Sequence, residues 1–387
     1  MENKWIRGAI PALLIHCSIG TVYCWSLLRN DICDSLMCSS HTIEWAFSLA
    51  IFFLGMSAAF GGNLVEKNVK LSAVVSALCF FGGMIGAGLS IASGSVVGLL
   101  MCYGVLMGIG LGVGYLTPVK TLMMWFASHK GLATGIAITG FGLAKVIASP
   151  IISYLLTHTS VECTFYILGS VYFVLMLIGA WCIKKPNGSE SLKGKTFNFR
   201  TALQIIVNKK YMAIWTVFFI NITCGLALIS QEKSILISCG FGAYVALISS
   251  LTACFNSAGR FVYSTASDKV RDRSVIYSII FLSSAITICG YWVVGSLMAI
   301  VLAILLVCNA GYGGGFSTLP SLLSDNFGMK NVSVIHGFAL SAWAWAGLVG
   351  NHLGNYLLSK FDIPVLFAVL CVLYCIAFFI TSKYIEN

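Results

Sequence analysis

Twelve apolar runs of about 20 residues each decide what this chain can fold into. A run of that length forms a helix that can cross the roughly 30 Å hydrocarbon core of a bilayer. The runs lack the alternation of transmembrane strands, so strands are excluded. The sequence therefore predicts an all-α membrane protein with twelve transmembrane helices. The expected helices cover residues 8–28, 42–64, 70–91, 96–126, 131–157, 161–183, 209–232, 241–265, 274–294, 296–324, 332–358 and 363–382.

The composition agrees with this prediction. Hydrophobic residues make up 58% of the chain and charged residues only 9%, and the mean hydropathy is +0.92. No soluble fold of this length could bury that much apolar surface. The net charge of +10 would suit nucleic-acid binding, but the basic residues gather in the segments between helices. Their placement indicates membrane orientation, so no nucleic-acid partner is expected.

The distribution of Lys and Arg predicts that both termini are cytoplasmic. With that orientation, three basic residues lie in outer loops (Arg29, Lys233 and Lys360), and three lie within helices (Lys120, Lys145 and Arg260). A split of 17 inner to three outer residues follows the positive-inside rule for a multi-pass protein of the cell membrane. The 17 inner residues are Lys4, Arg7, Lys67, Lys70, Lys130, Lys184, Lys185, Lys193, Lys195, Arg200, Lys209, Lys210, Lys269, Arg271, Arg273, Lys330 and Lys383.

Residues 1–28 carry no convincing small-residue cleavage site, so they are expected to form the first helix rather than a removed signal. The 15 cysteines are scattered through the helices as small core residues. Cys33 and Cys38 share the first predicted outer loop, where they are either a disulfide or two free thiols. The six histidines show no metal-ligand spacing, so neither a metal nor a cofactor is expected.

One polar segment, from Lys184 to Lys210, divides the chain into two halves. We expect a six-helix bundle over residues 1–183, a cytoplasmic linker over 184–208 and a second six-helix bundle over 209–387. An amphipathic piece around Phe197–Val207 is expected to lie on the membrane surface.

The two halves repeat two motifs. Gly62–Lys70 and Ser264–Arg273 each place an acid beside a base after the second helix of their half. Gly108–Phe126 also echoes Asn309–Phe327, with Pro118 and Gly112 matching Pro320 and Gly314. Internal repeats of this kind are typical of secondary transporters, whose binding sites lie near the membrane midplane between the halves.

Arg260 lies inside the apolar stretch Phe241–Ala266. A charge in a membrane helix is costly unless it faces a water-filled cavity or an anion. Asn256 and Thr252 precede it at i−4 and i−8, so the three side chains form a polar stripe on one helix face. This pattern predicts an anion site, because a guanidinium can bind a carboxylate through two parallel hydrogen bonds. The alternative is that Arg260 extends to the nearby membrane interface.

Two lysines also lie within predicted helices. Lys145 is 15 residues from Lys130, so it lies near the midplane, and no acid is expected at that depth. It is either a cation of the binding site or a lysine deprotonated by its apolar surroundings. Lys120 is about two turns from the cytoplasmic end, so its ammonium is expected to extend to the interface.

Four segments together resemble the major facilitator superfamily and, within it, the oxalate/formate antiporter family, which is similar to the monocarboxylate transporters. They are Thr21–Leu28, Gly110–Gly142, Asn256–Lys269 and Asn326–Gly350. The resemblance covers essentially the whole chain. It implies alternating access and a small organic anion bound between the halves.

The resemblance also implies roles for individual residues. Arg260 matches the carboxylate-binding arginine of the family, and Asn256 stands where animal monocarboxylate transporters have an aspartate. Trp343 occupies the position of a lysine that oxalate exchangers carry, which argues against oxalate. Lys145 could replace that missing cation and bind a second carboxylate. The aromatic walls of the site match Tyr23, Tyr115 and Tyr312, although these and Trp343 could instead be packing residues.

The resemblance to the superfamily implies that the acid–base loops act as cytoplasmic gates, whose residues exchange partners during transport. Their residues here are Glu66, Lys67, Asp268, Lys269 and Arg271.

The prediction is therefore a transporter of a mono- or dicarboxylate, working as a monomer and by anion exchange. Glu44 lies near an outer helix end and the other acids in loops or tails, so a carboxylate proton relay is not expected. The alternatives are a proton-linked monocarboxylate symporter and an anion sensor that transports nothing. No converging catalytic side chains are found, so an enzyme is not expected. His16, on the same face as Tyr23, is expected to be a core histidine.

Overall fold

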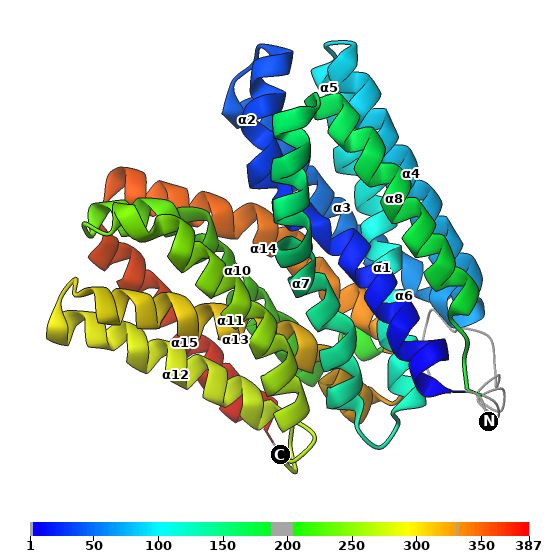
Figure 1. Cartoon of the computed structure of the whole chain (residues 1–387). Coiled ribbons are helices and arrows are strands. Elements are labelled where there is room, and N and C mark those ends of the chain that lie inside the picture. Colours follow the sequence, from blue (N-terminus) through cyan, green and yellow to red (C-terminus); the bar gives the residue numbers. More distant parts are fainter. Residues whose placement is uncertain (1–2, 187–203, 330–331, 387) are drawn as a thin grey trace.

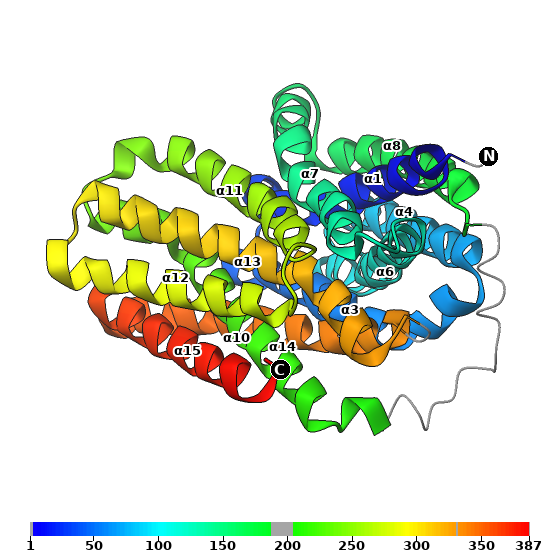
Figure 2. The same cartoon turned by 90° about the horizontal axis from the view of Figure 1, so that it is seen from below.

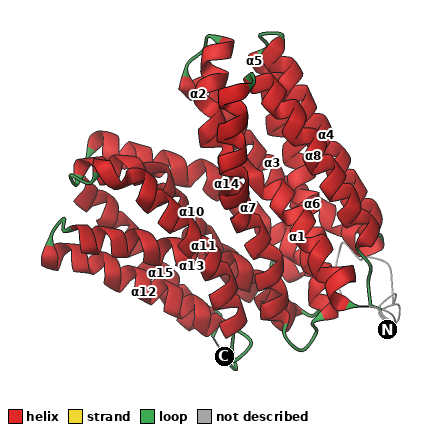
Figure 3. Ribbon diagram, in the orientation of Figure 1, coloured by secondary structure: helices red, strands yellow, loops and turns green. Residues whose placement is uncertain are grey.

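A computed structural model describes residues 3–186, 204–329 and 332–386. Within these ranges the chain is helical and contains no strand (Figure 3). The helices form two bundles, one from each half of the chain (Figure 1). The bundles meet on the side that carries both termini, here called the termini side, and diverge toward the opposite side, here called the far side.

In the first half, the first span is a composite of η1 (Trp5–Ala9), α1 (Ile10–Ile19), η2 (Gly20–Cys24) and α2 (Trp25–Leu36). The fourth span is likewise continuous through α5 (Val96–Leu99), η3 (Leu100–Met107) and α6 (Gly108–Trp125). The other long helices of this half are α3 (Ser40–Lys67), α4 (Val69–Ala92), α7 (Lys130–His158) and α8 (Val161–Cys182).

In the second half, the short helix η5 (Gly242–Tyr244) leads into α11 (Val245–Ala266). The other long helices are α10 (Lys209–Ser238), α12 (Ser274–Val294), α13 (Met298–Phe327), α14 (Val332–Lys360) and α15 (Ile363–Tyr384). Figure 2, which views the molecule from the termini side, shows the two sets of helices lying beside each other.

Eleven helices of the described residues are long and apolar enough to cross a membrane. The twelfth predicted span is α11, which has 22 residues but carries the polar stripe ending at Arg260. The multi-pass helical fold is therefore confirmed, and the polar α11 is the helix that departs from a uniformly apolar composition.

Two helices extend well beyond their predicted ends. The first span continues to Leu36, so Cys33 lies within α2 rather than in a loop, and both Cys33 and Cys38 are free thiols. The seventh span, α10, continues to Ser238, six residues past its predicted end. The amphipathic piece predicted at Phe197–Val207 lies largely outside the described residues, so the linker and the half boundaries stay predictions.

Side-chain caps set several helix starts. Ser39, Asn68, Ser160 and Asn208 each accept a hydrogen bond from a backbone N–H in the first turn of the helix that follows. Such caps satisfy N–H groups that have no partner within the helix. They fix where helices begin on both sides of the bundle.

Small residues let helices of opposite halves pack closely. A Cβ atom on Gly337 of α14 would lie 2.1 Å from the carbonyl oxygen of Ala58 in α3, and one on Gly131 of α7 would lie 1.9 Å from that of Ser264 in α11. Close helix approach of this kind is the usual role of glycine in membrane bundles. The pairs α3–α14 and α7–α11 thus form the interface between the halves.

Candidate functional site

Arg260 is enclosed at the interface between the two halves. Its side chain is 1% exposed, and its Nε donates a hydrogen bond of 2.9 Å to Oδ1 of Asn256. The guanidinium lies over the rings of Phe316 in α13, at 5.3 Å, and Phe141 in α7, at 5.9 Å. Its Nη2 has no hydrogen-bond partner in the part of the chain that the structure describes.

This geometry encloses the Arg260 side chain between the halves rather than at the membrane interface. By helical rise it lies about 9 Å from the end of α11, within reach of that interface for an extended side chain. The side chain instead bonds to Asn256 and packs between rings of both halves. A buried guanidinium with a free N–H group is set up to bind an anion.

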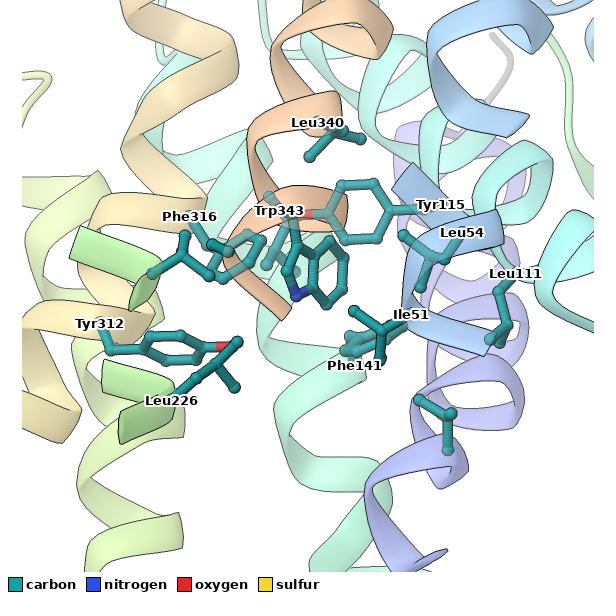
Figure 4. Packing of buried hydrophobic residues seen from close by; sticks show 14 of the residues in the cluster. Ile51, Leu54, Leu111, Tyr115, Phe141, Leu226, Tyr312, Phe316, Leu340 and Trp343 are labelled. Carbon is teal, nitrogen blue, oxygen red and sulfur yellow. The ribbon is translucent and has the colours of Figure 1, made fainter. Parts of the chain in front are cut away.

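Tyr115, Phe141, Phe316 and Trp343 pack together beside Arg260, and this set is called the aromatic cluster. Phe141 and Phe316 lie against the guanidinium itself. Figure 4 shows Trp343 between Tyr115 and Phe316, with Phe141 below. Ring centroids are 4.6 Å apart for Phe316–Trp343, 5.8 Å for Tyr115–Trp343 and 6.0 Å for Phe141–Trp343. The cluster joins α6 and α7 of the first half to α13 and α14 of the second.

The aromatic cluster also contains unused polar atoms. The hydroxyl of Tyr115 and the indole Nε1 of Trp343 are buried without a hydrogen-bond partner among the described residues. Buried donors normally have partners, and an unmade hydrogen bond costs about 1–3 kcal/mol. A ligand with acceptor oxygens could satisfy them, as it could satisfy Arg260.

Tyr23 and Tyr312 meet across the two halves. Their hydroxyl oxygens are 3.4 Å apart, and the ring of Tyr23 also packs edge-on against Phe141 at 5.3 Å. Tyr312 lies one helical turn before Phe316 on α13, on the far side of Arg260. The structure thus brings the three predicted tyrosines, Trp343, Arg260 and Asn256 to one region between the halves.

His16 lies next to this region but inside the first half. Its ring nitrogens contact the backbone carbonyl oxygens of Ala137 and Tyr115, the latter at 3.1 Å, and its ring stacks on Tyr115 at 5.3 Å. These contacts are those of a core histidine, and they fix the position of Tyr115.

A buried acid was missed by the sequence prediction. Glu232 was expected at the very end of the seventh helix, beside the outer loop, but α10 continues past it, and Glu232 is only 7% exposed. Thr252 donates its hydroxyl toward both carboxylate oxygens at 3.2 Å. The signal that could have found it is apolar spacing, because Ile235 and Leu236 continue the buried face of the helix beyond Glu232.

Glu232 also corrects the expectation for Lys145. Lys145 is half-buried on α7, three residues beyond Gly142, which faces Ser257 of α11. It therefore lies about level with Thr252, the partner of Glu232. The statement that no acid lies at its depth is therefore wrong, because the longer α10 supplies one.

Lys120 does not extend to the membrane interface as predicted. Its ammonium is buried and bonds to both carboxylate oxygens of Glu66, at 2.8 and 3.0 Å. It also donates to the carbonyl oxygen of Met329 in the second half, at 2.8 Å. Glu66 in turn accepts from the backbone N–H of Ser333, at 3.1 Å. A fixed partner thus replaces solvent for this ammonium, and the contacts tie the halves together on the termini side.

Asp268 makes a second connection on the same side. Its two carboxylate oxygens accept from the backbone N–H groups of Gly131 and Leu132 at the start of α7, both at 2.8 Å. Arg273 binds it at 2.8 Å. A carboxylate at a helix N-terminus is stabilised by the free N–H groups and by the helix dipole.

A third connection joins Lys130 to Asp325, at 2.8 Å, and Arg273 to the same carboxylate, at 2.5 Å. Of the predicted gating residues, Glu66 and Asp268 therefore bridge the halves. Lys67, Lys269 and Arg271 are exposed. The cations that contact the opposite half are Lys120 and Lys130, while Arg273 binds Asp268 and Asp325 within its own half.

These features define a class of protein. Two helical bundles held together on one side by polar contacts, apart on the other, and enclosing an arginine between them have the architecture of a secondary membrane transporter. Such carriers work by rocking one bundle against the other around a central site.

Comparison with known proteins gives the family. The chain belongs to the Major Facilitator Superfamily, whose family profile matches residues 12–351. It is therefore a transporter of that superfamily and not an enzyme.

The comparisons also identify individual proteins that the chain is similar to. The chain is 28% identical to the oxalate:formate antiporter of Oxalobacter formigenes, over 98% of this chain and 90% of that protein. Monocarboxylate transporter 7 of Homo sapiens is 24% identical over 42% of this chain and 30% of its own length. Among solved structures, the fucose:proton symporter of E. coli superposes with a TM-score of 0.71 at 13% identity, covering 98% of both chains.

The position of Arg260 depends on a glycine in the facing helix. A Cβ atom on Gly313 of α13 would lie 2.1 Å from the backbone oxygen of Asn256 and 3.0 Å from Cγ of Arg260. We expect Gly313→Ala to lower the free energy of unfolding by about 1–3 kcal/mol and to reduce substrate affinity, because α11 and α13 must separate. Gly82→Ala, whose Cβ would meet only Leu106 at 3.4 Å, is the control. Thermal unfolding in detergent and uptake by reconstituted protein measure both effects, and equal behaviour of the two variants would contradict the prediction.

Proposed function

We propose that this chain is a secondary active transporter of a small organic anion, a mono- or dicarboxylate, working by alternating access and anion exchange. The observation that carries the proposal is the enclosed Arg260, which keeps a free N–H group between the two halves. The resemblance to an oxalate:formate antiporter over nearly the whole chain supports the same substrate class.

The proposed site assigns a role to each side chain. Arg260 binds the substrate carboxylate, and Asn256 holds the guanidinium through its Nε. Tyr115 and Trp343 offer unused donors to the anion, while Tyr23 and Tyr312 close over it on the far side. Lys145 adds positive potential. A bound anion neutralises the buried guanidinium, which lowers the free energy of closing the halves around it.

The polar contacts on the termini side support a gate in its closed state. Glu66 and Asp268 each bind groups of the opposite half, so the substrate site is sealed from that side. With the predicted orientation this is the cytoplasmic side, and the conformation faces outward. Release to the cytoplasm then requires these contacts to break.

The second candidate is a proton-linked monocarboxylate symporter. Glu232 favours it, because a buried carboxylate can take up and release a proton as its access to water changes. Both candidates place the protein in the cell membrane with both termini cytoplasmic, acting as a monomer.

Counterflow in proteoliposomes tests the proposal. Labelled formate or lactate is supplied outside, with unlabelled carboxylate, or none, inside. Exchange predicts rapid uptake only with internal carboxylate and no response to an imposed pH gradient. Uptake that needs a pH gradient and no internal anion would establish the symporter. Binding of carboxylates without flux in sealed vesicles would indicate a sensor and overturn both.

A further inference from the structure

The polar stripe of α11 has a charged group at each end. At one end Asn256 accepts from Arg260, and at the other, two turns away, Thr252 donates to Glu232. By helical rise, Thr252 lies about 12 Å from Arg260 along the helix. Glu232 therefore shares one polar surface with the substrate-binding arginine, although it comes from a different helix, α10.

Thr252 and Ser249 offer hydroxyl groups to the Glu232 carboxylate, but these are neutral and leave its charge unbalanced. The Thr252 hydroxyl supplies a single hydrogen shared between two oxygens, at 3.2 Å from each. A carboxylate that stays ionised in a membrane helix needs a nearby cation, since its desolvation is otherwise too costly. Glu232 is 7% exposed, so bulk water contributes little to balancing this charge.

Lys145 is placed to be that cation. Along the contact between α7 and α11, Gly131 faces Ser264, and Gly142 faces Ser257 and Arg260. The two helices run antiparallel, so Lys145, almost one turn beyond Gly142, lies at a level between Asn256 and Thr252. Glu232, which accepts from Thr252, therefore lies at about the same level as Lys145, across the interface between the halves.

We propose that Glu232 is a specificity-determining residue that balances Lys145 and restricts the site to monocarboxylates. Arg260 and Lys145 contribute two positive charges and Glu232 one negative charge, so the three sum to one positive charge. A monoanion on Arg260 brings the closed site to neutrality, whereas a dianion leaves it with an unpaired negative charge. This inference rests on the proposed function and narrows its substrate class.

Variants that remove one or both of these charges test this inference. The measurement is the ratio of uptake of labelled lactate to that of labelled malonate under counterflow conditions. Glu232→Gln leaves two positive charges, so we expect the lactate-to-malonate ratio to fall by on the order of tenfold through a gain of malonate uptake. Lys145→Met leaves no net charge, and lactate uptake should fall by a similar factor. The double variant Glu232→Gln/Lys145→Met again carries one positive charge, and lactate uptake should recover above that of Lys145→Met.

The control is Glu44→Gln, which removes an acid that is 51% exposed and paired with Arg29. This variant should keep the wild-type ratio. A wild-type ratio in active Glu232→Gln protein, or a double variant no better than Lys145→Met, would overturn the inference. If Glu232→Gln alone does not fold, the comparison of the double variant with Lys145→Met tests the inference. If the wild type transports neither anion, the proposed function itself has failed, which is a different result.

Discussion

Arg260→Lys is expected to reduce carboxylate uptake by about a hundredfold, because it removes a hydrogen bond between charged groups, which contributes about 1.5–3 kcal/mol. Lysine keeps the positive charge, but it is a single ammonium group and cannot form two parallel hydrogen bonds to a carboxylate. It also has no Nε–H to donate to Asn256 while other groups bind substrate. Initial rates of labelled lactate uptake into proteoliposomes measure the loss.

Arg29→Lys is the matched control for this prediction. Arg29 is paired with Glu44 at 2.7 Å, but the two side chains are 38% and 51% exposed, and surface pairs of this kind contribute at most about 1 kcal/mol. We expect uptake near the wild-type rate. If Arg260→Lys or Arg260→Ala also transports at that rate, the carboxylate binds elsewhere and Arg260 is structural.

The arginine site could be predicted because its signal is local. A charge within an apolar run, with Asn256 and Thr252 at helical spacing, specifies one face of one helix without any knowledge of its neighbours. The structure keeps Arg260 and Asn256 in contact, and it also shows what the stripe faces. The contact between Tyr23 and Tyr312 joins residues 289 positions apart, so no local pattern could have supplied it.

Glu232 was missed for a different reason. The predicted end of its helix fell at the first charged residues, Glu232 and Lys233, because charges usually mark where a span leaves the membrane. The chain instead buries Glu232 against Thr252 and continues to Ser238. A polar contact with another helix overrode the hydropathy signal, and helix ends are the least certain part of any such prediction.

The sequence predicted the gating loops but not the residues with which their acids pair. Each loop offers several bases within a few residues, and the backbone path through a tight turn decides which of them points inward. Arg273 binds Asp268 and Asp325, whereas Arg271, two residues earlier, is exposed. For Glu66, the cation is Lys120 from another helix rather than the adjacent Lys67.

Asp268→Asn is expected to shift the protein away from the conformation described here, with the termini side closed, by more than about tenfold in population. Asp268 accepts from Gly131 and Leu132 at the start of α7 and binds Arg273. Hydrogen bonds to charged groups contribute about 1.5–3 kcal/mol each, and the neutral amide also loses the helix-dipole interaction. Asparagine has one side-chain acceptor oxygen where aspartate has two, so it cannot serve both N–H groups.

The distance between labels at Thr159 and Ser296, exposed residues on the far side of opposite halves, reports the shift. If the termini side opens in Asp268→Asn, the far side closes, and the population with the shorter distance should grow. Uptake should fall as well, because the carrier then spends less time open to external substrate. Arg271→Gln, in the same loop but exposed, should leave both distance and uptake unchanged. An unchanged distance in Asp268→Asn would mean that Lys120–Glu66 and Lys130–Asp325 hold the closed side without it, and that the contact of Asp268 with α7 follows closure rather than stabilising it.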